Sequence, residues 1–184
     1  MNIDQTIEVL KNGGTILYPT DTIWGLGCDA TNEEACQQLL EIKNRPTEKS
    51  FIVLVDGFPM LEKYILEFHP VCYDLVDFAE KPMTIIYPSA KGFAPSVIAA
   101  DGSVGIRITK DPNCLKMIRA LRKPIVSTSA NLSGEDAPIN FKEINPAIKQ
   151  NVTAILEERT NEEMTSPSQI IKIDLDGSVK LIRG

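Results

Sequence analysis

Short runs of apolar and β-branched residues, separated by helical stretches and turns, most constrain what this 184-residue chain can fold into. Several runs are bounded by Pro, Gly or Lys, a pattern that predicts short buried strands. Strands and helices alternate without a strict strand–helix–strand rhythm, so we predict an α/β fold with a twisted, mixed open sheet and flanking helices. The length is typical of one domain, which we place at residues 1–184. The predicted strands are residues 15–19, 51–55, 84–87, 104–108, 125–127, 154–156, 170–174 and 179–182.

Helix boundaries are marked by capping residues, glycine and proline. Residues 31–34 (TNEE) form a capping-box pattern that predicts the start of a helix, and residues 44–46 (NRP) predict its end. Residues 12–14 (NGG) end a predicted N-terminal helix, and residues 176–177 (DG) predict a hairpin turn between the last two strands. Further helices are predicted after residues 57–59, across 71–79 and across 115–121.

The acidic balance of the chain limits the partners that it can bind. The formal net charge is −6 and the pI is about 4.9, which opposes general electrostatic adhesion to nucleic acid. Any contact with RNA should therefore be local. No apolar run approaches the length of a membrane span, and the N-terminus lacks the basic region and apolar core of a signal peptide. We therefore expect a cytoplasmic location without membrane contact.

Cysteine and histidine usage gives no sign of a metal site. The four cysteines form no CxxC pair and show no zinc-like spacing, so we expect reduced thiols, with neither disulfides nor structural zinc. His69 is the only histidine and is followed by Pro70, which makes it a poor candidate for a metal cluster or a Ser-His-Asp triad. No residue is assigned to a metal.

A polar cluster follows the predicted strand at residues 125–127. Residues 124–134 (PIVSTSANLSG) run from apolar side chains into hydroxyls, one amide and a glycine. Ser127, Ser129 and Asn131 alternate along the chain, so an extended backbone would project them to one face, where they could bind oxygen-rich groups. The competing interpretation is an ordinary turn at a strand end, capped by Asn131.

Two cations stand where a predicted helix breaks. Lys43 and Arg45 would diverge on an ideal helix, but they can converge if Pro46 unwinds its last turn. Lys49 adds a third cation four residues after Arg45. The cluster could neutralise phosphate oxygens, or it could be a solvated basic patch.

The segment after the first strand carries the only tryptophan. In residues 19–27 (PTDTIWGLG), the glycines could let the backbone approach a ligand while Trp24 walls a pocket. Alternatively, the segment is a turn with Trp24 packed beneath it. None of the 11 glycines completes GxxxxGK[ST] or GxGxxG, and no GxSxG elbow is present. Any nucleotide site must therefore be built another way.

Four ordered motifs together resemble the YrdC/TsaC family of threonylcarbamoyl-AMP synthases. They are residues 19–27 (PTDTIWGLG), 43–46 (KNRP), 103–107 (SVGIR) and 127–134 (STSANLSG), and the resemblance covers nearly the whole chain. The spaced family pattern Lys-x-Arg and Ser-x-Asn implies four catalytic residues, Lys43, Arg45, Ser129 and Asn131.

The resemblance implies a nucleotidyltransferase with a YrdC-like fold that joins L-threonine, bicarbonate or CO2, and ATP into L-threonylcarbamoyladenylate and pyrophosphate. Mg2+ would accompany ATP, and a transferase complex would then use the adenylate for the t6A modification of tRNA. The threonine contacts implied are Thr22, Arg107, Ser127 and Ser168. The ATP contacts implied are Arg45, Lys49, Ser103, Ser129 and Arg183.

The chain departs from the family pattern at several positions, and two other functions stay open. Trp24 replaces a usual tyrosine, residues 81–84 (KPMT) replace Pro-Gly-Pro-x-Thr, and Ser168-Gln169 replaces Ser-Thr. One alternative is a module that binds double-stranded RNA, which the acidic charge disfavours. The other is the carbamoyl-transfer module of hydrogenase-maturation proteins, which the lack of a cysteine-rich zinc segment disfavours.

Overall fold

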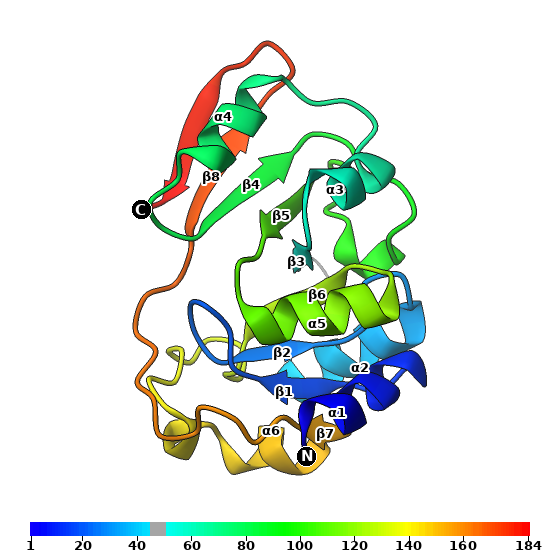
Figure 1. Cartoon of the computed structure of the whole chain (residues 1–184), viewed down its shortest axis with the longest axis vertical. Coiled ribbons are helices and arrows are strands. Elements are labelled where there is room, and N and C mark those ends of the chain that lie inside the picture. Colours follow the sequence, from blue (N-terminus) through cyan, green and yellow to red (C-terminus); the bar gives the residue numbers. More distant parts are fainter. Residues whose placement is uncertain (45–50) are drawn as a thin grey trace.

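One nine-stranded sheet runs through the residues that the computed structural model describes, 1–44 and 51–184 (Figure 1). The strand order is β7-β1-β2-β6-β3-β5-β4-β8-β9. Helices cover both faces, so the predicted α/β fold with an open sheet is confirmed. The strands are β1 (Ile16–Tyr18), β2 (Gly25–Gly27), β3 (Ile52–Val55), β4 (Met83–Tyr87), β5 (Val104–Ile108), β6 (Ile125–Ser129), β7 (Ala154–Ile155), β8 (Gln169–Ile173) and β9 (Val179–Arg183).

The sheet is mixed, as the irregular rhythm of the sequence predicts. The pairs β1–β7, β3–β5 and β4–β8 are parallel. The pairs β1–β2, β2–β6, β3–β6, β4–β5 and β8–β9 are antiparallel. Because β6 lies between β2 and β3, the polar segment that follows β6 comes close to motifs far earlier in the chain.

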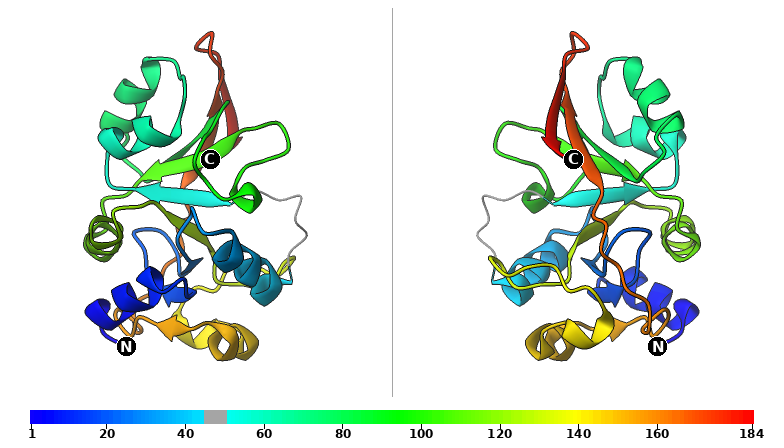
Figure 2. Two further views of the ribbon diagram at one scale, coloured as in Figure 1. Left: turned by 90° about the vertical axis from the view of Figure 1, so that its right-hand side faces the viewer. Right: turned by 90° about the vertical axis from the view of Figure 1, so that its left-hand side faces the viewer.

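The helices form a layer on each side of the sheet (Figure 2). Helices α1 and α5 pack against one another on one face, whereas α2 packs with α6 on the other. The helices are α1 (Ile3–Lys11), α2 (Glu33–Lys43), α3 (Phe58–Tyr64), α4 (Val71–Asp77), α5 (Pro112–Leu121) and α6 (Pro146–Asn151), with 3-10 helices at Pro95–Val97 and Phe141–Glu143.

The start of α2 differs in detail from the prediction. Asn32, not Thr31, is the N-cap, and its side chain accepts a hydrogen bond from the backbone N–H of Ala35 at 3.2 Å. The hydroxyl of Thr31 instead donates to Asp29 Oδ1 at 2.7 Å. Asparagine is at least as good an N-cap as threonine. Because Ala35 occupies the N3 position, no reciprocal capping box forms, and the helix starts one residue later than predicted.

Among the strands and α-helices of the described residues, β2 and α6 were not predicted from the sequence. A Cβ on Gly27 would lie against the carbonyl oxygen of Val126 and 2.8 Å from the ring of Tyr18. The glycine therefore lets β2 pack closely between β1 and β6, so the end of the segment at residues 19–27 is a strand and not part of a turn. The helix α6 has a readable start, because Asn145 caps it and Pro146 occupies its first turn.

The four cysteines are free and buried. Cys28 and Cys36 lie close to one another, with their sulfur atoms 3.7 Å apart. Among the helices in the described parts of the chain, none combines the length and apolar character needed to cross a membrane.

Candidate functional site

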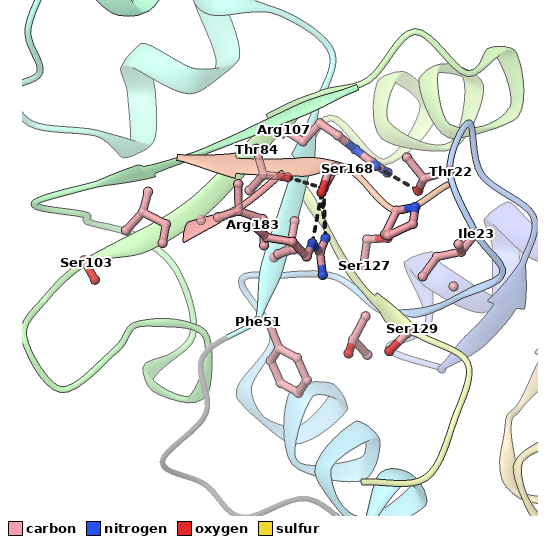
Figure 3. Close-up of a pocket in the computed structure, with 17 residues that line it drawn as sticks. Thr22, Ile23, Phe51, Thr84, Ser103, Arg107, Ser127, Ser129, Ser168 and Arg183 are labelled. Carbon is pink, nitrogen blue, oxygen red and sulfur yellow. Dashed lines mark hydrogen bonds between the residues drawn. The ribbon is translucent and has the colours of Figure 1, made fainter. Parts of the chain in front are cut away.

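A cavity of about 330 Å³ lies over strands β3 to β6, beside the turn that joins β1 to β2 and the segment that enters β8 (Figure 3). None of its described lining residues is acidic, and two of them are arginines, so its charge favours an anionic ligand. The lining residues are Thr22, Ile23, Gly25, Phe51, Ile52, Thr84, Ile86, Ser103, Gly105, Arg107, Ser127, Thr128, Ser129, Pro167, Ser168, Ile170 and Arg183.

Arg107 on β5 is the most deeply buried cation of this cavity. Its side chain is 4% exposed. Its NH1 donates to the hydroxyl of Thr22 at 2.9 Å, and its NH2 lies 3.1 Å from Asp21 Oδ1. Within the described residues, its Nε has no hydrogen-bond partner. A buried guanidinium donor without a partner is costly, so this group is suited to a carboxylate or phosphate ligand.

The turn after β1 orients Thr22 toward Arg107. The hydroxyl of Thr20 donates to the carbonyl of Ile23 at 2.8 Å, so its oxygen accepts from the Thr22 hydroxyl, 2.9 Å away. The lone pairs of the Thr22 oxygen are then available to the guanidinium of Arg107. This relay fixes the hydroxyl and the guanidinium in one arrangement.

Ser168 joins two strands at the opposite wall of the cavity. Its hydroxyl lies 2.8 Å from the hydroxyl of Thr84 on β4. Its carbonyl oxygen accepts from Nε and NH2 of Arg183 on β9, at 3.1 and 2.8 Å. Burial, and secondly the charge of Arg107, lower the pKa of Arg183 from its usual value, which indicates that the two guanidinium groups repel one another. An anion between them would relieve that repulsion.

Lys43 lies at the end of α2 and is buried, not part of a solvated patch. It is 2% exposed, and its Nζ donates to the carbonyl oxygens of Ser129 at 2.5 Å and of Asn131 at 2.6 Å. The ammonium therefore holds the end of β6 by its backbone. The described lining of the cavity does not include Lys43.

Comparison with known proteins decides the family. The family model Sua5_yciO_yrdC, described as "Telomere recombination", matches residues 8–184. The chain belongs to the Sua5/YciO/YrdC family. A relative from Vibrio campbellii, named threonylcarbamoyl-AMP synthase, is 34% identical over 173 residues, which are 92% of each chain.

Solved structures of the Sua5/YciO/YrdC family share the fold. P. abyssi Sua5 complexed with L-threonine superposes with a TM-score of 0.83 at 23% identity, over 93% of this chain and 50% of that one. E. coli YciO superposes with a TM-score of 0.82 at 23% identity, over 98% of this chain and 87% of that one. The chain thus spans about half the length of Sua5 and most of the length of YciO.

The cavity gathers the threonine contacts that the family resemblance implies. All four of them line it, and so do three of the implied ATP contacts, Ser103, Ser129 and Arg183. The roles of these residues stay predictions. Arg45 and Lys49, the other implied ATP contacts, lie outside the described residues.

Asn131 caps the turn that follows β6. Its Nδ2 donates to the carbonyl oxygens of Leu132 at 2.9 Å and of Glu135 at 2.6 Å. Its Oδ1 is buried and has no partner within the described residues. Unlike Ser127 and Ser129, it is not part of the described cavity lining. The amide nitrogen of Asn131 therefore caps the turn, as the capped-turn interpretation predicts. Its amide oxygen can accept a further hydrogen bond.

Ser103 and Trp24 make contacts that the sequence did not predict. The hydroxyl of Ser103 donates to Asp101 Oδ1 at 2.6 Å, and this hydrogen bond is the main cause that lowers the pKa of Asp101. Trp24 is fully buried and packs against Phe141, with ring centroids 5.1 Å apart. It does not wall the described cavity, so the prediction of a tryptophan wall was wrong and the packed-turn alternative holds.

Sequence reasoning missed two residues of the site, Thr84 and Asp21. Thr84 contacts Ser168, which lies 84 positions away in the sequence, and no local sequence pattern predicts such a long-range contact. Asp21 stands directly before Thr22 in the segment already singled out, and it forms the ion pair with Arg107. A carboxylate beside a candidate hydroxyl was the available signal.

Proposed function

We propose that this chain is a threonylcarbamoyl-AMP synthase, a nucleotidyltransferase that makes L-threonylcarbamoyladenylate and pyrophosphate from L-threonine, bicarbonate or CO2, and ATP. The name of the Vibrio relative, at 34% identity over 92% of both chains, supports this activity. The adenylate then serves the t6A modification, so tRNA is the final target of the pathway. A downstream transferase complex would take the threonylcarbamoyl group from the adenylate.

The observation that carries the proposal is the buried Arg107, whose Nε has no partner within the described residues. Hydroxyls surround it in the cavity, among them Thr22, Ser127 and Ser168. An amino acid with a carboxylate and a hydroxyl matches this donor set, because the guanidinium binds the carboxylate and the hydroxyls bind the polar side chain. P. abyssi Sua5, which shares the fold, was solved with L-threonine bound.

The reaction joins two anions, the carbamate of threonine and ATP, so the protein must offset their repulsion. The amine of threonine attacks CO2, loses a proton and becomes a carbamate. A carbamate oxygen then attacks the α-phosphorus of ATP, and the bond to pyrophosphate breaks. Positive charge is needed to offset the repulsion. Arg183, which lines the cavity, is our candidate to supply it. Arg45 and Lys49 are the further candidates from the family pattern.

Lys43 takes a supporting part in this proposal. Its ammonium holds the carbonyls of Ser129 and Asn131, and so fixes the direction in which the Ser129 side chain meets the cavity. Serine hydroxyls at a fixed strand end can orient a phosphate or the carbamate. The contribution of Lys43 is then preorganisation of β6.

Mg2+ enters this scheme as part of the substrate MgATP. No group of three or more His, Cys, Asp or Glu side chains in the described ranges is arranged to hold a metal ion. The described cavity lining offers hydroxyl and carbonyl oxygens without a carboxylate. That donor set suits an ion that keeps its water and phosphate ligands.

The test is a reaction of purified protein with ATP, Mg2+, L-threonine and bicarbonate. Mass spectrometry should detect threonylcarbamoyl-AMP, and pyrophosphate release should require both threonine and bicarbonate. Equal pyrophosphate release without threonine would disprove the proposal. Release with carbamoyl phosphate in place of threonine and bicarbonate would point instead to carbamoyl transfer.

A further inference from the structure

Arg159 ties together three segments that are far apart in the sequence. Its NH1 donates to the carbonyl oxygen of Thr20 at 3.1 Å and to Asp111 Oδ2 at 2.9 Å. Its Nε donates to Glu162 Oε2 at 2.8 Å. The guanidinium therefore connects the turn after β1, the N-cap of α5 and the segment between β7 and β8.

Thr20 connects Arg159 to the cavity through hydrogen bonds. The carbonyl oxygen of Thr20 accepts a hydrogen bond from Arg159. The hydroxyl of Thr20 bonds to the hydroxyl of Thr22, at 2.9 Å. Thr22 in turn accepts from NH1 of Arg107 at 2.9 Å. A movement of the Thr20 peptide would thus move the groups that orient the Arg107 guanidinium.

The segment that carries Arg159 also supplies the opposite wall of the cavity. Residues 157–168 run along the side of the sheet from β7 toward β8 (Figures 1 and 2). Met164 fixes the middle of this segment, because it is buried and its N–H donates to the carbonyl of Ile139 at 2.7 Å. Pro167 and Ser168 at its end line the cavity. Arg159 is therefore linked to one wall of the cavity by its bond to Thr20, and to the opposite wall through its own segment.

The backbone of Arg159 adopts a conformation that glycine favours. Its φ of 54° lies in the left-handed region, which residues with a side chain occupy infrequently. Glycine adopts this conformation without strain. Arg159→Gly therefore removes the guanidinium and leaves a backbone that suits the native conformation.

We infer that Arg159 is a positioning residue for the threonine-binding end of the cavity, acting on Arg107 through Thr20 and Thr22. This inference rests on the proposed function. It assigns to Arg159 an effect on threonine recognition, separate from ATP recognition at Ser103 and Ser129. The ion pair with Asp111 holds the guanidinium in place, and the bond to Thr20 transmits its effect.

The test compares three variants with the wild-type protein by initial rates of pyrophosphate release and by calorimetric titration with L-threonine alone. Arg159→Gly removes every bond of the guanidinium, and Arg159→Lys keeps the charge with a single donor group. Glu162→Gln is the matched control, because it weakens the other ion pair of Arg159 and leaves the bond to Thr20. Thermal unfolding checks that each variant is folded.

Arg159→Gly should raise the KM for threonine about tenfold, the loss expected for a disturbed charge-assisted hydrogen bond, with kcat and the KM for ATP within about twofold. Arg159→Lys should recover part of that loss, and Glu162→Gln should match the wild type. An unchanged threonine KM in Arg159→Gly, or an equal rise in both KM values, would overturn the inference. If the wild-type protein binds L-threonine but makes no product, only the proposed function is contradicted. The calorimetric affinities of the variants for L-threonine would then test the inference about Arg159.

Discussion

Lys43 holds Ser129 by its backbone, since Nζ donates to the Ser129 carbonyl oxygen at 2.5 Å across 86 positions of sequence. A second bond, to the carbonyl of Asn131, makes the ammonium the link between α2 and the end of β6. The alternative that Lys43 is a solvated charge is therefore wrong. Buried hydrogen-bonding groups lose much more when their partner is removed.

Lys43→Met should lower the free energy of unfolding by about 2–3 kcal/mol, because it leaves two carbonyl oxygens without their donor. Urea denaturation measures the change. Lys11→Met is the control, since Lys11 is exposed and pairs with Glu8 on its own helix. Unchanged stability together with lost activity would show that Lys43 acts on the substrate and not on the fold.

Arg107→Lys should lower kcat/KM for threonine about 100-fold, because an ammonium cannot replace the fork that bonds Thr22, Asp21 and a ligand. Initial rates at varied threonine give this ratio. Arg119→Lys is the control, because Arg119 is an exposed arginine that forms a long ion pair with Asp56, at 3.7 Å. A similar kcat/KM for Arg107→Lys and the wild type would exclude Arg107 from threonine binding.

Gly27→Ala should lower the free energy of unfolding by about 3 kcal/mol, because its Cβ would overlap the backbone of Val126 and the ring of Tyr18. Gly134→Ala should have an effect of about 1 kcal/mol, since among the described residues no atom beyond its chain neighbours lies within 4 Å of its Cβ, and its φ of 92° opposes the change. Urea denaturation compares the two. Equal losses would mean that β2 moves to accept the methyl group.

The thiols should be unreactive in the native protein at pH 8. Burial raises the pKa of Cys72 to about 11, and it is also the main cause that raises the pKa of Cys114. In the folded protein the Cys72 thiol stays neutral up to a pH of about 11, whereas in the unfolded chain it ionises at about 8.5. This difference stabilises the folded state fully below about pH 8.5, and the stabilisation is lost as the pH rises toward 11. Thiol titration with and without urea, and urea denaturation at pH 8 and 10, measure both effects. Rapid reaction of a native thiol would contradict the prediction.

Much of the fold was readable from local patterns. The runs at β3, β4 and β5 are short, apolar and bounded by turn residues, and the DG turn before β9 has its glycine at a φ of 83°. The strand β2 was not readable, because its glycines are explained by contacts with Tyr18 and Val126 that only the folded sheet creates. The position of β6 between β2 and β3 has the same long-range origin.

The sequence by itself determined the α/β class, the family motifs and the set of polar residues from which the site is built, because capping residues, turn residues and hydrophobic runs act over a few positions. Tertiary structure decided which of these residues meet. It turned Lys43 to the backbone of β6, buried Trp24 against Phe141, and brought Thr84 to Ser168 and Arg159 to Thr20. The physical reason is that each of these contacts satisfies a polar group or fills core volume, and its partner lies tens of residues away, where the packing of the folded chain sets the distance.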